Sequence, residues 1–248
     1  RKGGLMAAIE NERPLEGRTA LVTGSSKGIG AATARALAAA GAHVILTGRD
    51  VRALEAVEDA IHEAGGASTI APVDLTETDG IARLASAIAG RWDTLDGLVI
   101  AAAYLPTLTP VTQIDAKQFG QAITTNILAT QALLAAFDPL LKRADAAKVI
   151  GLTSSVGETP RAYWSAYAST KAAFDNLLES YAQEVEKVSK VCVAILDPGA
   201  TRTSMRAKAY PGEDPKTVKE PDVVADRIVE LMVNGFDSAH RERVSEPD

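Results

Sequence analysis

Short runs of β-branched and apolar residues alternate with longer helical stretches along most of the chain. This alternation predicts strands joined by parallel βαβ crossovers. The strand runs are almost continuously apolar, which is expected when helices cover both faces of a sheet. The pattern therefore predicts an α/β fold, a doubly wound Rossmann-type parallel sheet in three layers. The predicted strands cover residues 18–23, 43–47, 69–73, 97–102, 148–153 and 190–196.

Turn and capping residues limit the helices between these strands. Gly41 ends an alanine-rich segment, and Asp50 is placed to cap the next helix. The predicted helices cover residues 28–40, 50–64, 78–90, 115–141 and 165–188. The last two carry apolar residues on more than one face. We therefore expect them to pack against a partner subunit as well as the sheet, in a homodimer or homotetramer.

The chain has 248 residues, of which 46% are hydrophobic and 23% are charged, and no compositional break divides it. We therefore predict one dinucleotide-binding and catalytic domain over 1–248. Residues 1–16 are interpreted as a flexible N-terminal extension. The connection at 204–221 contains prolines, a glycine and several charges, and its length predicts a substrate loop or lid. A solvated surface excursion is the alternative for this segment.

The formal net charge is −6, and the 26 lysines and arginines are scattered, which argues against a nucleic-acid partner. The chain lacks an apolar run of the roughly 18 residues that a membrane span requires. The single cysteine, Cys192, lies in an apolar run and fits a strand thiol in a reducing compartment. We expect a soluble cytoplasmic protein. The three dispersed histidines suggest neither a metal cluster nor a hydrolase triad.

A glycine-rich turn, Thr-Gly-Ser-Ser-Lys-Gly-Ile-Gly over residues 23–30, follows the first predicted strand and opens the first helix. Its glycines, Gly24, Gly28 and Gly30, let the backbone turn sharply and let a pyrophosphate approach the helix N-terminus. The spacing differs from the common G-x-G-x-x-G pattern because three residues separate the first two glycines. A ligand-free turn is the alternative for this motif taken alone.

The end of the second predicted strand indicates which cofactor the chain prefers. A carboxylate there would bind the ribose hydroxyls of NAD, whereas a basic group would attract the 2′-phosphate of NADP. The strand ends in Thr-Gly-Arg with Arg49 last, and Lys27 in the turn is a second candidate cation. Asp50 is a carboxylate that would favour NAD instead, although it fits better as a helix cap. NADP (NADPH) is therefore favoured over NAD.

Tyr167 and Lys171 stand four residues apart in a predicted helix, which places them on one face about 6 Å apart along the axis. A free tyrosine has a pKa near 10, and lowering it to about 7 requires roughly 4 kcal/mol in favour of the phenolate. One ammonium about 5 Å away supplies on the order of 3 kcal/mol at an effective dielectric constant of about 20. An oxidised nicotinamide nearby would add a second positive charge. The alternative for the pair taken alone is an ordinary helix surface.

Taken together, these motifs resemble the short-chain dehydrogenase/reductase family over residues 17–233, in particular the single-domain subgroup that includes 3-oxoacyl-carrier-protein reductases and related ketone or alcohol oxidoreductases. The resemblance rests on the order and spacing of several motifs. These are the turn at 23–30, Asp74-Leu75, Asn126, Ser154, the Tyr167 and Lys171 pair, and Pro198-Gly199 followed by Thr203.

The resemblance implies roles for four residues in an NADP-preferring enzyme. Tyr167 would be the general acid and base at the substrate oxygen, and Ser154 would hydrogen-bond the same oxygen. Lys171 would lower the phenol pKa and hold the nicotinamide ribose, while Asn126 would hold a water that links Lys171 to bulk solvent. Ser154 lies three residues before Gly157 and thirteen before Tyr167, as in the family pattern. Ser155, the alternative, is more typical of a structural turn hydroxyl.

The resemblance also implies which residues bind the cofactor. Asp74 and Leu75 would border the adenine, and the segment 198–203 would line the nicotinamide. The expected cofactor-binding residues are Gly24, Ser26, Lys27, Gly28, Ile29, Gly30, Arg49, Asp74, Leu75, Ala101, Tyr167, Lys171, Pro198, Gly199, Thr201 and Thr203.

Two departures from the family pattern matter. Residues 100–103 read Ile-Ala-Ala-Ala where the family usually has Asn-Asn-Ala-Gly after the fourth strand. We therefore expect weaker support for the backbone and for the adenosine side of the site. The chain also lacks the usual glycine-rich final strand near its end, which argues against the tetramer interface made by that strand.

The substrate is expected to be a small-molecule carbonyl or alcohol, contacted by Arg161, Trp164 and Met205. The cations near these residues hint at an acidic or phosphate-bearing substrate, although Arg161 and Trp164 fit a scaffold role equally well. The alternative function is a non-catalytic dinucleotide-binding sensor or scaffold of the same fold. The joint presence of the four catalytic candidates favours an enzyme. An epimerase or dehydratase would usually carry a longer substrate domain than this chain has room for.

Overall fold

A computed structural model describes residues 13–245, and the first twelve residues of the predicted N-terminal extension lie outside them. Within this range the strands are β1 Thr19–Thr23, β2 His43–Thr47, β3 Ala67–Ile70, β4 Gly97–Ile100, β5 Lys148–Leu152, β6 Cys192–Asp197 and β7 His240–Arg243. They form one parallel seven-stranded sheet in the order β3-β2-β1-β4-β5-β6-β7. This sheet confirms the predicted α/β class.

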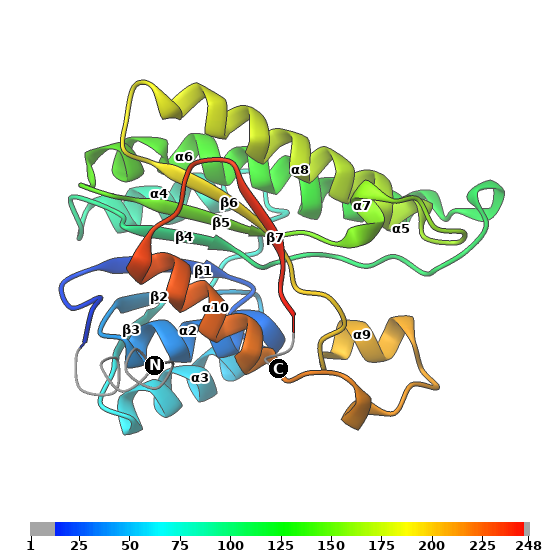
Figure 1. Ribbon diagram of the computed structural model, residues 1–248, viewed down its shortest axis with the longest axis horizontal. Helices are drawn as coiled ribbons and strands as arrows, with labels where there is room; N and C mark the ends of the chain where they lie inside the picture. Colours follow the sequence, from blue (N-terminus) through cyan, green and yellow to red (C-terminus); the bar gives the residue numbers. More distant parts are fainter. Residues whose placement is uncertain (1–12, 246–248) are drawn as a thin grey trace, which may run out of the picture.

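Helices cover both faces of the sheet (Figure 1). They are α2 Gly28–Ala39, α3 Val51–Glu63, α4 Gly80–Ala89, α5 Ala116–Ile123, α6 Ala129–Arg143, α7 Ser155–Glu158, α8 Ser165–Glu186, α9 Ser204–Ala209 and α10 Pro221–Asn234, with 3₁₀ turns at Val111–Gln113 and Pro215–Thr217. One layer contains α2, α3 and α10, and the other contains α4, α6 and α8 (Figure 1). The three-layer prediction is confirmed. In residues 13–245, no helix is long and apolar enough to cross a membrane.

The central strands bury side chains on both of their faces. Leu21 of β1 and Leu98 of β4 belong to the core under α4, α6 and α8, whereas Val22 and Val99 belong to the core under α2, α3 and α10. Successive side chains of a strand point to opposite faces, so a strand covered on both sides must be apolar at every position. This explains the continuous apolar runs in the sequence.

Gly151 of β5 lets helix α8 lie close to the sheet. A Cβ atom at this position would be 2.3 Å from Cδ1 of Leu178 and 2.8 Å from Cζ of Phe174. Both of these side chains are fully buried. The close approach matters because α8 also carries Tyr167 and Lys171.

The bounds of β3 and β4 differ from the prediction. β4 stops at Ile100 instead of continuing to residue 102, because the amides of Ala101 and Ala102 donate to the Thr23 hydroxyl, each at 3.1 Å, instead of continuing the ladder. β3 is displaced toward the N-terminus, at Ala67–Ile70, since Ala67 already pairs with His43. The backbone past its end still donates from Ala71 to the carbonyl of Leu46.

The structure has a seventh strand, β7, that the sequence patterns did not predict. β7 lies parallel to β6 at the edge of the sheet, although it is not glycine-rich. Its sequence, His-Arg-Glu-Arg, has no apolar run from which a strand would be predicted. The strand forms because β6 offers an open edge and because ion pairs hold the side chains of β7 to α8 and α10.

The predicted single helix over 115–141 is interrupted. A π-helical turn, Thr124–Leu128, separates α5 from α6 and contains Asn126. Asn126 bonds to the backbone of Tyr104 and to Thr170 of α8, and these tertiary hydrogen bonds accompany the wider turn. Single π turns inside α-helices often occur at functional sites.

The predicted N-terminal extension and the predicted loop at 204–221 are both ordered where the structure describes them. Residues 13–16 pack on the end of α2: Leu15 is buried, and its amide donates to the carbonyl of Ala40. The segment 204–221 forms α9, a 3₁₀ turn and a bridge between Thr201 and Lys219, so it has regular structure, while its role as a lid stays a prediction. Ion pairing between Arg206 and Glu213 holds it together.

The predicted contact with a partner subunit through residues 115–141 and 165–188 stays a prediction. Two large apolar side chains in or beside these segments are exposed: Leu128 is 56% exposed and Val188 is 70% exposed. Both are available to pack against a second copy.

We predict that Gly151→Ala lowers the free energy of unfolding by about 1–3 kcal/mol, because the new methyl group overlaps Leu178 and Phe174. Urea denaturation followed by circular dichroism measures the change. Gly120→Ala is the matched control: nothing lies within 4 Å of the added Cβ, and the helix gains up to about 1 kcal/mol. Equal stability of Gly151→Ala and the wild type would contradict the packing argument.

Candidate active site

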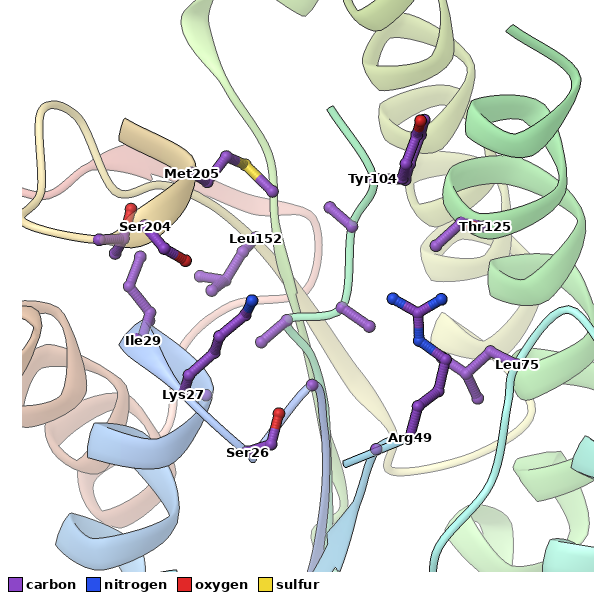
Figure 2. A pocket seen from close by; sticks show the side chains of 18 of the residues that line it. Ser26, Lys27, Ile29, Arg49, Leu75, Tyr104, Thr125, Leu152, Ser204 and Met205 are labelled. Carbon is purple, nitrogen blue, oxygen red and sulfur yellow. The ribbon is translucent and has the colours of Figure 1, made fainter. Parts of the chain in front are cut away.

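A cavity of about 230 Å³ opens at the carboxyl ends of the strands, between the ends of β1 and β4 (Figure 2). The strand order reverses at this point, because β1 lies beside both β2 and β4. Ligands of open α/β sheets bind at such a switch point. The cavity is lined by most of the residues predicted to bind the cofactor: Gly24, Ser26, Lys27, Gly28, Ile29, Gly30, Arg49, Asp74, Leu75, Ala101, Tyr167, Lys171, Pro198 and Thr203.

The glycine-rich turn is too tight for larger residues. Gly24 and Gly28 have φ angles of +64° and +56°, in the region that favours glycine. A Cβ on Gly30 would lie 2.2 Å from the carbonyl oxygen of Gly24. Ser25, which the sequence analysis did not single out, is fully buried and fixes the turn by donating from its amide and hydroxyl to the Thr47 carbonyl.

The turn has the features that a pyrophosphate site needs. At the N-terminus of α2, Lys27 occupies the capping position, and its side chain makes no capping hydrogen bond. The first amides of the helix and its dipole therefore favour an anion in the cavity. A dinucleotide phosphate fits this arrangement.

The side chains of Lys27 and Arg49 both extend into the cavity (Figure 2). Asp50, the carboxylate that would favour NAD, caps α3 by accepting from the amide of Ala53 at 3.1 Å. Asp74 accepts from the amide and the hydroxyl of Thr76. Partial burial raises the pKa of Asp74, but these bonds and the nearby Arg49 outweigh it and hold the pKa below its usual range. Two cations and one turn-bound carboxylate thus border this end of the cavity.

The backbone of the Ile-Ala-Ala-Ala segment, residues 100–103, is held by hydrogen bonds even without the asparagine side chains that the family usually has there. Thr23 is fully buried at the end of β1, and its hydroxyl accepts from the amides of Ala101 and Ala102. The backbone after β4 is therefore fixed from the neighbouring strand. Because a Cβ on Gly24 would lie 2.9 Å from Cα of Ala102, the segment also packs tightly against the turn.

Asn126 organises the wall beside the cavity. It is 1% exposed, accepts from the Tyr104 amide at 2.8 Å, and donates to the Tyr104 carbonyl at 3.0 Å and the Thr170 hydroxyl at 2.9 Å. Thr170 precedes Lys171 on α8, and its hydroxyl donates a hydrogen bond to the carbonyl of Tyr167. Asn126 therefore contacts the helix that carries the candidate acid but does not itself line the cavity.

Lys171 is 2% exposed, and its ammonium donates to the carbonyl of Leu152 at 2.7 Å. The same nitrogen lies 4.1 Å from the ring centre of Phe174 and 5.9 Å from that of Tyr167. Burial lowers the pKa of Lys171 to about 8, while the charge of Asp175 opposes this shift. The two side chains lie side by side, as their spacing predicts.

The expected lowering of the phenol pKa is not produced by the protein groups. Burial raises the pKa of Tyr167 above its ordinary value, and the charges of Asp197 and Asp175 raise it further. The phenol therefore keeps its proton at neutral pH. The cost of desolvating the phenolate outweighs the Coulomb attraction expected from Lys171, and this burial cannot be judged from two residues four apart.

A second cavity, of about 300 Å³, meets the first at Tyr167. Ser154 and Ser155 both line it, and Ser154 caps α7, where its oxygen lies 3.5 Å from the amide of Val156. The predicted cofactor residues Gly199 and Thr201 line this second cavity and not the first. Thr201 is almost fully buried and donates to the carbonyl of Pro198.

The three predicted substrate residues surround the second cavity. The ring of Trp164 lies 6.1 Å from the ring of Tyr167 and 5.9 Å from that of Tyr210. Arg161 donates to the hydroxyl of Tyr210 at 2.9 Å, which joins the loop before α8 to α9. Met205 of α9 lines both cavities. The walls combine apolar and aromatic side chains with charged ones, namely the guanidinium groups of Arg161, Arg206 and Arg243 and the carboxylate of Asp197.

Several lining residues were missed from the sequence. Tyr104, Thr125, Leu152 and Ser204 line the first cavity (Figure 2). Tyr104 and Leu152 follow or end central strands, so the rule that ligands bind at the carboxyl ends of strands was a usable signal. Thr125 could not be predicted, because it lies in the π-helical turn, which the sequence pattern does not indicate.

Comparisons with known proteins agree on one class. The chain belongs to the short chain dehydrogenase family, whose sequence model matches residues 18–214. It is 35% identical over 230 residues to the uncharacterized oxidoreductase YciK of Escherichia coli, covering 92% of this chain and 90% of that one. These matches confirm the predicted family.

Two solved structures superimpose closely. A short chain dehydrogenase of Shigella flexneri complexed with NADP has a TM-score of 0.90 and 32% identity, covering 94% of this chain and 99% of that one. A short chain dehydrogenase of Escherichia coli complexed with NADPH has a TM-score of 0.89 and 33% identity, covering 95% and 100% of the respective chains. The chain is thus an oxidoreductase-family protein with a Rossmann-type fold.

We predict that Asn126→Ala lowers the free energy of unfolding by about 1–3 kcal/mol, because the amide and carbonyl of Tyr104 and the hydroxyl of Thr170 lose their partner. Thermal and urea unfolding measure the loss. Gln131→Ala, on the exposed side of α6, serves as the control and should change stability by less than about 0.5 kcal/mol. Equal stability of the two variants would show that the Asn126 bonds do not hold this wall.

Proposed function

We propose that the protein is an NADP-preferring oxidoreductase that interconverts a ketone and a secondary alcohol, with Tyr167 as the proton donor and acceptor. The observation that carries the proposal is the position of Tyr167, whose side chain lines both cavities where they meet. A group bound in the first cavity and a group bound in the second would both reach the phenol.

The residues of the first cavity suit NADP(H). The turn at 23–30 would bind the pyrophosphate, Arg49 and Lys27 would bind the 2′-phosphate, and Leu75 would border the adenine. Pro198 and Thr203 would line the nicotinamide, and Lys171 would hold its ribose. When bound, the cofactor supplies or accepts the hydride. The NADP and NADPH complexes of the two structural neighbours support this assignment for the chain.

The catalytic side chains would each perform one task at the substrate oxygen. In ketone reduction the Tyr167 O–H bond breaks as its proton passes to the carbonyl oxygen, which becomes the alcohol. Ser154 would donate a hydrogen bond to that oxygen as negative charge develops on it. Lys171 would stabilise the phenolate left behind, and Asn126 would hold the turn of α8 that carries both residues through its hydrogen bond to Thr170. The raised pKa keeps the proton on the phenol at neutral pH but makes the phenol a weaker acid, so the positive charges of Lys171 and of an oxidised nicotinamide would be needed to stabilise the phenolate.

The substrate would bind in the second cavity. Leu105, Val156 and Trp164 form its apolar part, and Met205 of α9 would close over the substrate with the rest of the segment 204–221. Arg161 at the rim would contact a polar or acidic end of the substrate. The function is tested by oxidation of NADPH with a panel of ketones; failure to bind either NADPH or NADH would disprove it.

We predict that Tyr167→Phe lowers kcat by about 10²–10⁴-fold and leaves NADPH affinity within about threefold of the wild type. Steady-state kinetics and fluorescence titration measure the two effects. Tyr181→Phe is the matched control, since Tyr181 lies on the same helix but its hydroxyl bonds to Asp138, away from both cavities. A Tyr167→Phe enzyme with most of its activity would rule out this acid.

We predict that Arg49→Ala raises the Kd for NADPH by about 10- to 100-fold and leaves the Kd for NADH nearly unchanged, because only NADPH carries the 2′-phosphate. Isothermal titration measures both constants. Arg52→Ala removes a neighbouring exposed arginine that does not line the cavity, and it should change neither constant. A wild type that binds NADH more tightly than NADPH would overturn the role of Arg49.

A further inference from the structure

Helix α8 carries a third buried ionisable residue on the face that holds Tyr167 and Lys171. Asp175 follows Lys171 by four residues, so the three side chains recur at the spacing that keeps one face of a helix. Asp175 is 6% exposed, although Asp is rarely buried without a partner. The proposed mechanism gives it no task.

The partner of Asp175 comes from the last strand of the sheet. Nη2 of Arg241 in β7 lies 2.7 Å from Oδ2 of Asp175. Oδ1 is buried and has no hydrogen-bond partner among the residues that the structure describes. A buried carboxylate whose second oxygen is unpaired carries a large desolvation cost, which the ion pair with Arg241 offsets.

Arg241 also joins two elements of the active site. Its Nη1 atom donates to Glu179 of α8 at 3.2 Å, and Nη2 lies 3.9 Å from Glu158. Glu158 is the last residue of α7, the short helix that Ser154 caps. One side chain of β7 therefore contacts both the helix of Tyr167 and Lys171 and the helix that begins at Ser154.

We propose that Asp175 and Arg241 are positioning residues for the acid–base pair: the Asp175 carboxylate keeps the buried Lys171 charged and the Tyr167 phenol protonated, and Arg241 limits how far that negative charge acts. The inference rests on the proposed function for its catalytic meaning. The predicted effect of Asp175 on the charge of Lys171 does not rest on that function, because both residues are buried whatever reaction the protein catalyses.

The charges around the pair support this direction. After the larger effect of burial, Asp175 raises the pKa of Lys171, and together with Asp197 it raises the pKa of Tyr167. The other charged groups that face this region are Glu158 of α7, Glu179 of α8, and Asp197 of β6 with Arg243 of β7 at 3.8 Å. Among these groups, Asp175 lies on the face of α8 that carries Tyr167 and Lys171, and Arg241 is its ion-pair partner.

Two substitutions should therefore act in opposite directions. Asp175→Asn removes a negative charge and should lower the pKa of Lys171 by about half a unit to one unit. It should also move the alkaline limb of kcat/KM for ketone reduction to lower pH. Arg241→Gln leaves the carboxylates uncompensated and should raise the pKa of Lys171 and move the same limb to higher pH.

The pKa of Lys171 is read from a pH titration of protein carrying ¹³C-labelled lysine by NMR, with the signal assigned by its loss in Lys171→Arg. This measurement needs no turnover, so it tests Asp175 even if the wild type reduces no ketone. Absence of ketone reduction would count against the proposed function alone. Circular dichroism verifies that each variant is folded.

Two controls separate electrostatics from packing. Glu179→Gln alters the exposed partner of Arg241 and should shift the Lys171 pKa by less than half of the shift seen for Asp175→Asn, because Glu179 is 46% exposed and its charge is screened. Arg241→Lys keeps the charge and should restore most of the wild-type pH profile. If Asp175→Asn does not fold, the contrast between Arg241→Gln and Arg241→Lys decides the question. Shifts in the same direction, or no shift in either variant, would overturn the proposal.

Discussion

An ammonium group with almost no access to water has to be solvated by the protein, and Lys171 obtains this from the carbonyl of Leu152 and the ring of Phe174. Leu152 is the last residue of β5, so this bond ties α8 to the carboxyl end of the sheet. It can form because Gly151 leaves room for α8 to approach. The position of Tyr167, one turn away, depends on the same contact.

The opposite wall of the cavity is fixed by hydrogen bonds to backbone groups. Asn126 holds Tyr104 just after β4, and Thr23 holds Ala101 and Ala102 at the start of the same segment. Both side chains are buried and come from elements distant in sequence from the segment they hold. The cavity thus keeps its shape through polar contacts in a region where the chain itself has only small apolar residues and one tyrosine.

The sequence was most informative where one local pattern sufficed. Continuous apolar runs located six strands, Asp50 was a correct cap, and the spacing of Ser154, Tyr167 and Lys171 identified side chains that the fold brings to one pair of cavities. Features that depend on distant partners were not predictable. β7 has no apolar pattern and forms on the free edge of β6, and the break at Asn126 is tied to contacts with Tyr104 and Thr170. The sign of the Tyr167 pKa shift depended on burial, which local spacing does not reveal.

The edge position of β7 has a consequence for the order in which the molecule is assembled. A ribosome releases α8, with Tyr167, Lys171 and Asp175, some sixty residues before it releases Arg241. During that interval the buried Asp175 carboxylate lacks its guanidinium. The ion pair between Asp175 and Arg241 therefore forms only after β7 has been synthesised, which makes the final packing of this end of α8 depend on the edge strand.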